Sequence, residues 1–102
     1  MYVGRCCVIQ FEWDSRKNTA NIRKHGISFE DAQSAFYDEY ARIIPDPEHS
    51  ADEERFVLLG MTAHAQIVIV CHCYRENERV IRIISARRAD RHEEKGYVEF
   101  LS

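Results

Sequence analysis

Arginines gather in one apolar segment of the sequence, Arg82-Ile83-Ile84-Ser85-Ala86-Arg87-Arg88-Ala89. A guanidinium offers a planar fork of donors that matches phosphate or carboxylate oxygens. Arg82 and Arg87 could therefore stabilise the charge that builds up on a phosphodiester as it is cleaved. A plainer alternative is that these arginines form ion pairs with the acidic residues of segment 46–54, or with Glu93 and Glu94.

Two further residues could take part in such chemistry. His25 precedes Gly26 at the expected end of a helix, where the macrodipole favours a protonated imidazole that can transfer a proton. A histidine before a C-terminal glycine is also an ordinary helix end. Arg55 either binds a phosphate or balances Glu53 and Glu54, and the sequence leaves both roles open.

The cysteines do not predict a metal site. On a strand, Cys71 and Cys73 would lie on one face about 6.6 Å apart, with His72 on the opposite face, so they could not share one zinc. Cys6 and Cys7 would likewise face opposite sides. We expect reduced thiols, no metal and no cofactor.

Length and composition favour one folded domain over residues 1–102, a chain of 12.0 kDa. The longest clean apolar run, Ile67 to Cys71, is far shorter than a membrane span, and residues 1–11 lack the apolar core of a signal peptide. We therefore expect a cytoplasmic protein, with residues 1–10 as an extension that lies outside the core.

The net charge is −3, and the charged residues are unevenly distributed along the chain. Residues 28–54 carry nine acidic residues and one arginine, whereas residues 79–95 carry six basic residues and three acidic ones. The carboxyl-terminal third is thus the part suited to a polyanion, and the acidic segment would make a poor surface for DNA.

The order of predicted elements indicates an α+β domain. Alternating residues predict a strand over 8–13, and caps at Asp14 or Ser15 and at Ser28 predict helices over 16–25 and from 28 to about 38. A short strand is expected over 41–44, then an antiparallel meander over 55–61, 66–74 and 79–86 and a final helix after Asp90. The expected fold is a mostly antiparallel sheet with helices packed on one face and the other face open.

One feature complicates the arginine site. Arg82 and Arg87 are five residues apart, so an undistorted strand would point them to opposite faces of the sheet. A bulge, or the end of the strand, would have to bring them together.

Several segments in this order resemble the BrnT family, the toxin subunits of type II toxin–antitoxin systems. The similarity covers nearly all of the chain from Phe11 to Tyr97, and its segments are Phe11-Glu12-Trp13-Asp14, Asn21 to Ala32, Glu54-Arg55-Phe56 and Arg82 to Ala89, with Glu94 and Tyr97. The Lys-His-Gly and Ile-Ser-Ala-Arg motifs are its most specific parts.

The resemblance implies a RelE-like fold and a ribonuclease that inhibits translation. It also implies a BrnA-type antitoxin with a ribbon-helix-helix domain, through which the complex would contact DNA. On this basis we expect metal-independent cleavage by attack of the ribose 2′-OH. The residues expected to carry it are His25, Arg55, Arg82 and Arg87 as the catalytic group, with Lys24, Arg88 and Tyr97 as RNA contacts.

A second class of function also fits the sequence. In that alternative the protein is a non-catalytic binding module whose arginine cluster holds an acidic segment of a partner. An enzyme acting on a small phosphorylated substrate is disfavoured because no enclosed pocket is expected.

Overall fold

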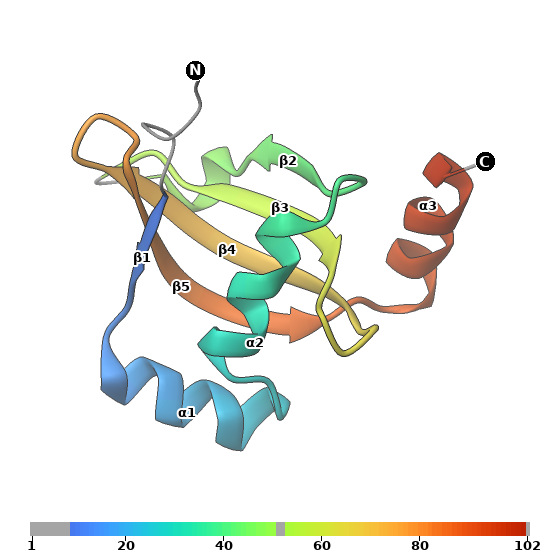
Figure 1. Ribbon diagram of the computed structural model, residues 1–102, viewed down its shortest axis with the longest axis horizontal. Helices are drawn as coiled ribbons and strands as arrows, with labels where there is room; N and C mark the ends of the chain where they lie inside the picture. Colours follow the sequence, from blue (N-terminus) through green and yellow to red (C-terminus); the bar gives the residue numbers. More distant parts are fainter. Residues whose placement is uncertain (1–8, 51–52, 102) are drawn as a thin grey trace.

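The protein is described from a computed structural model, which covers residues 9–50 and 53–101 (Figure 1). Cys6, Cys7 and the beginning of the strand expected over 8–13 lie outside the described residues. None of the described helices is long and apolar enough to cross a membrane.

A five-stranded sheet forms the centre of the fold. Its strands are β1 (Gln10–Glu12), β2 (Arg42–Pro45), β3 (Phe56–Met61), β4 (Ile67–Arg75) and β5 (Val80–Arg88), in the spatial order β1-β5-β4-β3-β2. Only β1 and β5 run parallel, and the other neighbours are antiparallel. The mostly antiparallel α+β architecture is confirmed, and β4, whose sequence is apolar on both faces, is the central strand.

Two helices cover one face of this sheet (Figure 1). Helix α1 (Ser15–His25) begins after Asp14, whose carboxylate accepts hydrogen bonds from the N–H groups of residues 16 and 17, and it ends at Gly26 with φ of 72°. Helix α2 (Phe29–Ser34) is capped by the Ser28 hydroxyl and continues as the 3₁₀ turn η2 (Ala35–Tyr37). These caps satisfy backbone groups that would otherwise have no partner.

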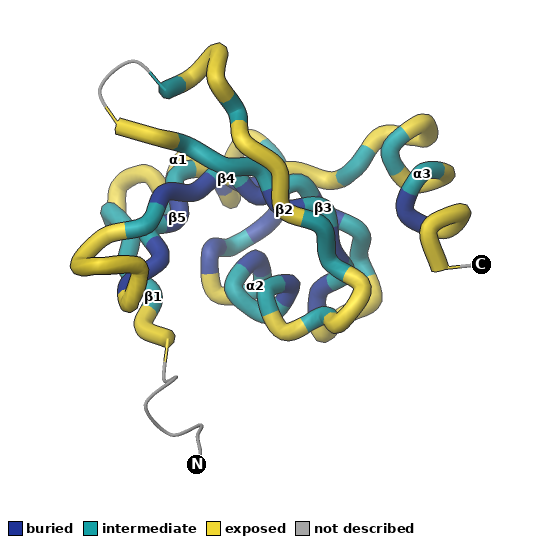
Figure 2. Tube along the Cα trace, turned by 90° about the horizontal axis from the view of Figure 1, so that it is seen from above, coloured by how far each residue is buried: buried dark blue, intermediate teal, exposed yellow. Residues whose placement is uncertain are grey.

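The core lies between these helices and the sheet, and its fully buried members include Ile27, Phe29, Val68, Val70 and Ile83. Figure 2 shows the buried positions following the inner strands. Burial of apolar side chains between a helical layer and a sheet is the main stabilising contribution in a domain of this size. The open face of the sheet is thereby left for other uses.

His72 is the one histidine among the fully buried residues that the structure describes. Its Nδ1 donates to the Val70 carbonyl oxygen at 3.1 Å, and the Tyr74 hydroxyl lies 3.3 Å from its Nε2. The Phe36 ring packs edge-on against it. Desolvation lowers the pKa of His72, so the imidazole is held neutral in the core.

Helix α3 (Arg91–Leu101) does not join α1 and α2, but stands beyond the end of the sheet (Figure 1). It begins with a reciprocal cap, in which the Asp90 carboxylate accepts from the Glu93 N–H and Glu93 accepts from the Asp90 N–H. Tyr97 fixes the helix, because its buried hydroxyl donates to the Asp38 carboxylate at 2.6 Å. The acidic start of α3 is thereby held beside the end of β5.

Candidate functional site

A β-bulge decides which face the arginines of β5 occupy. Ser85 lies opposite Cys71, but the next residue of β4, His72, lies opposite Ile83, so Ile84 has no partner. The extra residue shifts the alternation by one position. Arg82 and Arg87 therefore lie on the same face, the one that α1 and α2 leave uncovered.

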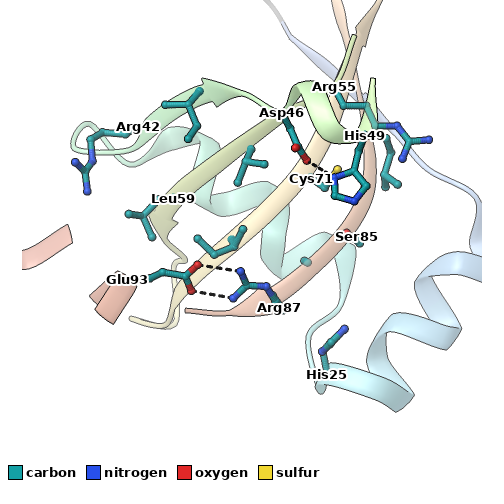
Figure 3. Close-up of a pocket in the computed structure, with 15 residues that line it drawn as sticks. His25, Arg42, Asp46, His49, Arg55, Leu59, Cys71, Ser85, Arg87 and Glu93 are labelled. Carbon is teal, nitrogen blue, oxygen red and sulfur yellow. Dashed lines mark hydrogen bonds and ion pairs between the residues drawn. The ribbon is translucent and has the colours of Figure 1, made fainter. Parts of the chain in front are cut away.

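A hollow of about 560 Å³ lies on this open face (Figure 3). Apolar side chains of β2 to β5 form part of its lining, and polar side chains come from these strands, from α1, from the segment between β2 and β3 and from α3. The polar residues of its wall are His25, Arg42, Asp46, His49, Arg55, Cys71, Ser85, Arg87 and Glu93. Three of the four residues expected to be catalytic, His25, Arg55 and Arg87, are thus brought to one pocket.

Arg87 is held by a carboxylate on the neighbouring helix. Its two terminal nitrogens donate to the two oxygens of Glu93 at 2.8 and 2.9 Å, as Figure 3 shows. The guanidinium beside it, aided by the Asp90 N–H, lowers the pKa of Glu93 to about 2. The anticipated alternative of an ion pair with Glu93 is therefore realised, and an incoming phosphate would have to share or replace this carboxylate.

Arg55 is positioned by the loop between β2 and β3. The Asp46 N–H donates to the Arg55 carbonyl at 2.8 Å, and the Arg55 N–H donates to the Ser50 hydroxyl at 2.9 Å. The loop includes the 3₁₀ turn η3 (Pro47–His49), whose His49 hydrogen-bonds through Nδ1 to the Asp46 carboxylate at 2.9 Å. Arg55 and His49 are thus fixed by one small network.

His25 enters the pocket from the carboxyl end of α1. The buried side chain of Asn21, one turn earlier, donates to the Ile27 carbonyl at 2.9 Å and also hydrogen-bonds to the backbone of Ala86. These bonds tie the end of α1 and the residues after Gly26 to the end of β5. His25 and Arg87 are consequently held on neighbouring parts of the pocket wall.

Arg42 and Cys71 complete the lining. The Arg42 guanidinium lies 4.6 Å from the centre of the Phe100 ring, and its Nε is a buried donor that the described residues leave without a hydrogen bond. Burial raises the pKa of the Cys71 thiol, so it remains protonated near neutral pH.

The other predicted site residues lie outside this pocket. Arg82 donates to the Glu12 carboxylate at 2.8 Å, near the β1 edge, although it shares the open face. Lys24 and Arg88 are exposed. Tyr97 is 2% exposed and bonded to Asp38, so its ring presents no open face on which a base could stack.

No group of three potential metal-ligating side chains occurs among the described residues, so nothing in this part of the chain favours a metal centre. The polar groups of the pocket are suited instead to binding an anion and transferring protons.

Sequence reasoning missed several pocket residues, namely Arg42, Asp46 and His49, and considered Glu93 only as a partner for the arginines. Acidic residues dominate the loop over 48–54, and such a composition is typical of a charged surface and gives no indication of a site. The one available signal was a histidine three residues after an aspartate, a spacing that a single helical turn brings together.

Comparisons with known proteins give a consistent result. A family model described as "Ribonuclease toxin, BrnT, of type II toxin-antitoxin system" matches residues 13–93. The crystal structure of the Brucella abortus ribonuclease toxin BrnT is similar, with 26% sequence identity and a TM-score of 0.64 over 81% of this chain and 99% of that chain. No curated protein matches the chain. The sequence segments, the fold and the family match agree, and the chain belongs to the BrnT family of ribonuclease toxins from type II toxin–antitoxin systems.

Proposed function

We propose that this protein is a metal-independent endoribonuclease that inhibits translation by cleaving RNA. The observation that supports this most directly is the meeting of His25, Arg55 and Arg87 in one hollow on the open face of the sheet. Two guanidinium groups and an imidazole are the types of side chain that phosphodiester cleavage needs when no metal ion takes part.

In the proposed reaction the ribose 2′-oxygen attacks the adjacent phosphorus. The P–O5′ bond breaks, leaving a 2′,3′-cyclic phosphate on one product and a 5′-hydroxyl on the other. Negative charge grows on the non-bridging oxygens as the bond order changes, and Arg87 and Arg55 bind those oxygens. His25 supplies a proton within the same pocket.

The arginine and lysine side chains outside the pocket would bind the flanking RNA. Arg82 lies on the open face towards β1, while Lys24 and Arg88 are exposed near the ends of α1 and β5. Phosphate contacts of this kind add affinity without reading the base sequence.

The proposed partner is a BrnA-type antitoxin with a ribbon-helix-helix domain, as expected for the family, and the complex would contact DNA through the antitoxin. Arg87 already donates two hydrogen bonds to one carboxylate, that of Glu93. An acidic segment of the antitoxin could occupy the same guanidinium and so block the RNA site.

Labelled total RNA, incubated with the purified protein in excess chelator, tests the proposed activity. We expect cleavage by the parent chain, with cyclic phosphate ends, and none by Arg87→Ala at equal concentration. Equal cleavage by both proteins would indicate a contaminating nuclease. Absence of cleavage by folded parent protein, with ribosomes also supplied, would favour the non-catalytic binding module.

Expression in cells tests the toxin and antitoxin roles. The parent chain should arrest growth when produced alone, and co-expression of the short reading frame beside its gene should restore growth. A binding module without nuclease activity would be tolerated.

A further inference from the structure

We propose that His49, oriented by Asp46, is the general base that removes the proton from the ribose 2′-hydroxyl. This inference rests on the proposed ribonuclease function and adds a catalytic residue and a positioning residue to it. Neither residue was expected from the sequence, and both belong to the pocket wall that also includes His25, Arg55 and Arg87.

The contact between the two side chains has the geometry that a base requires. Nδ1 of His49 lies 2.9 Å from Oδ2 of Asp46, and the dashed line in Figure 3 marks this bond. A carboxylate at Nδ1 holds the proton there, so Nε2 carries the lone pair in the neutral imidazole. The described residues form no hydrogen bond to Nε2, which leaves it available to a substrate.

The two side chains of the pair differ in their exposure to solvent. The Asp46 side chain is 19% exposed, whereas that of His49 is 64% exposed. The carboxylate is therefore the sheltered, positioning member, and the imidazole is the member that RNA can reach.

The Asp46 side chain contacts His49 and does not cap the turn η3 that follows it. It precedes the first residue of η3, where an aspartate commonly caps the turn, but here its side chain forms no capping hydrogen bond. Its backbone instead bonds to Arg55, and its carbonyl accepts from the Ser50 hydroxyl at 2.8 Å. The same hydrogen bonds therefore fix the positions of both Asp46, which orients the base, and the phosphate-binding Arg55.

The step balances with the groups already in the pocket. Nε2 of His49 accepts the 2′-hydroxyl proton as the 2′-oxygen forms its bond to phosphorus. The P–O5′ bond breaks, and protonated His25 gives its proton to the leaving 5′-oxygen. The resulting imidazolium of His49 is stabilised by Asp46, and proton exchange with water restores both histidines.

Other histidines in the described chain are placed differently. His72 is buried in the core, and His92 is absent from the pocket lining. His64 lies 3.2 Å from Asp31, in a comparable pair that is also outside the pocket. The His64 and Asp31 pair therefore provides a matched control for any general effect of removing an exposed ion pair.

Several ionisable groups surround His49 in the pocket. Asp46 contacts it directly, and the groups that share the pocket with it from other elements are His25, Arg42, Arg55, Cys71, Arg87 and Glu93. For this reason the test compares pH profiles between variants and does not depend on an absolute value.

The first test measures RNA cleavage by the parent and by His49→Gln, Asp46→Asn, His64→Gln and Asp31→Asn. We expect His49→Gln to lower kcat at least a hundredfold with little change in KM, because general base catalysis contributes about 10²- to 10⁴-fold. In the parent, kcat should rise with increasing pH as the base loses its proton, and His49→Gln should lack this rise. Asp46→Asn should lower kcat less and shift that rise, and both control variants should match the parent.

The second test assigns the direction of proton transfer. An RNA substrate with sulfur in place of the leaving 5′-oxygen needs no acid at that position, because a thiolate leaves readily. Cleavage of this substrate should be restored in His25→Gln but stay slow in His49→Gln. Restoration in His49→Gln would overturn the assignment of His49 as the base.

Two outcomes separate this inference from the proposed function. If the parent cleaves RNA and His49→Gln is as active as His64→Gln, the base assignment is wrong and the ribonuclease function stands. If the folded parent cleaves no RNA, both the ribonuclease function and the role of His49 are refuted. Circular dichroism of each variant confirms that the comparison is made between folded proteins.

Discussion

Asn21 and Ala86 are hydrogen-bonded to each other in both directions. The Asn21 side-chain nitrogen donates to the Ala86 carbonyl at 2.8 Å, and its side-chain oxygen accepts from the Ala86 N–H at 3.1 Å. A helix side chain thus takes the place of a neighbouring strand, immediately before Arg87. Because His25 lies one turn further along α1, this pair joins the two halves of the pocket.

Replacing Asn21 should therefore affect both stability and activity. Asn21→Ala leaves three buried backbone groups without partners, and we expect a loss of about 3 kcal/mol in the free energy of unfolding. Urea denaturation measures this loss, with Arg23→Ala on the exposed side of α1 as the control. A change below that of the control would show that water replaces these bonds at no cost.

Arg87 and its neighbour Arg88 allow a test of the face on which RNA is cleaved. Arg87 lines the pocket, whereas Arg88 pairs across the strands with the core residue Val68 and so belongs to the opposite face. We expect Arg87→Ala to lower kcat about 10²- to 10³-fold, as loss of a charge-stabilising donor does. Arg88→Ala should mainly weaken RNA binding, and equal losses of kcat would contradict this placement.

Glu93 should make stability depend on pH in the acidic range. Its pKa is about 2 in the folded protein against an ordinary value of 4.5, so the stabilisation is complete above pH 4.5 and disappears as the pH falls towards 2. Glu93→Gln should be less stable than the parent at pH 6, and the difference should shrink at pH 3. Thermal unfolding at both values measures it, with the exposed Glu99→Gln as the control.

His72 should produce a second pH dependence, at a higher pH. Burial lowers its pKa below the ordinary value of 6.5, so the unfolded chain binds a proton that the folded protein does not. Stability should be highest above pH 6.5 and fall below it, by at most about 1.4 kcal/mol per pH unit. His72→Phe should remove this part of the slope in urea denaturation, whereas His64→Gln should retain it.

Tyr97 is expected to support the fold and not the reaction. Tyr97→Phe removes the hydrogen bond to Asp38 and should cost about 1 kcal/mol of unfolding free energy while leaving kcat unchanged. Burial and the same bond raise the pKa of Tyr97 to about 12, so its absorbance should change only in strongly alkaline solution. A lower kcat in a stably folded Tyr97→Phe would instead support the prediction that Tyr97 contacts RNA.

Much of the fold could be predicted from local sequence signals. The caps at Ser28 and Asp90 and the left-handed Gly26 act within a few residues of the chain and lie where they were predicted, and Asp14 is one of the two candidates for the first cap. The central place of β4 also follows from its sequence, because apolar residues on both faces of a strand favour a position inside the sheet over one at its edge.

The pocket could be predicted only in part, because its geometry depends on distant contacts. A bulge at Ile84 sets the face of Arg87, and nothing local distinguishes that isoleucine from Ile83. The partner of Arg82, Glu12, is 70 residues away along the chain. His49 was hidden by the acidic composition of its loop, since composition reports the average of a segment and not the direction of one side chain.

The position of β5 has a consequence for how the toxin is made. This strand lies between β1 and β4, yet it is the last of the described strands in the order of synthesis. Until it emerges, α1 and β1 have no strand to pack on, and the segment carrying His25 is separate from the one carrying Arg55. Because non-local pairing must wait for the chain that provides it, the pocket that holds His25, Arg55 and Arg87 cannot assemble before β5 has been synthesised.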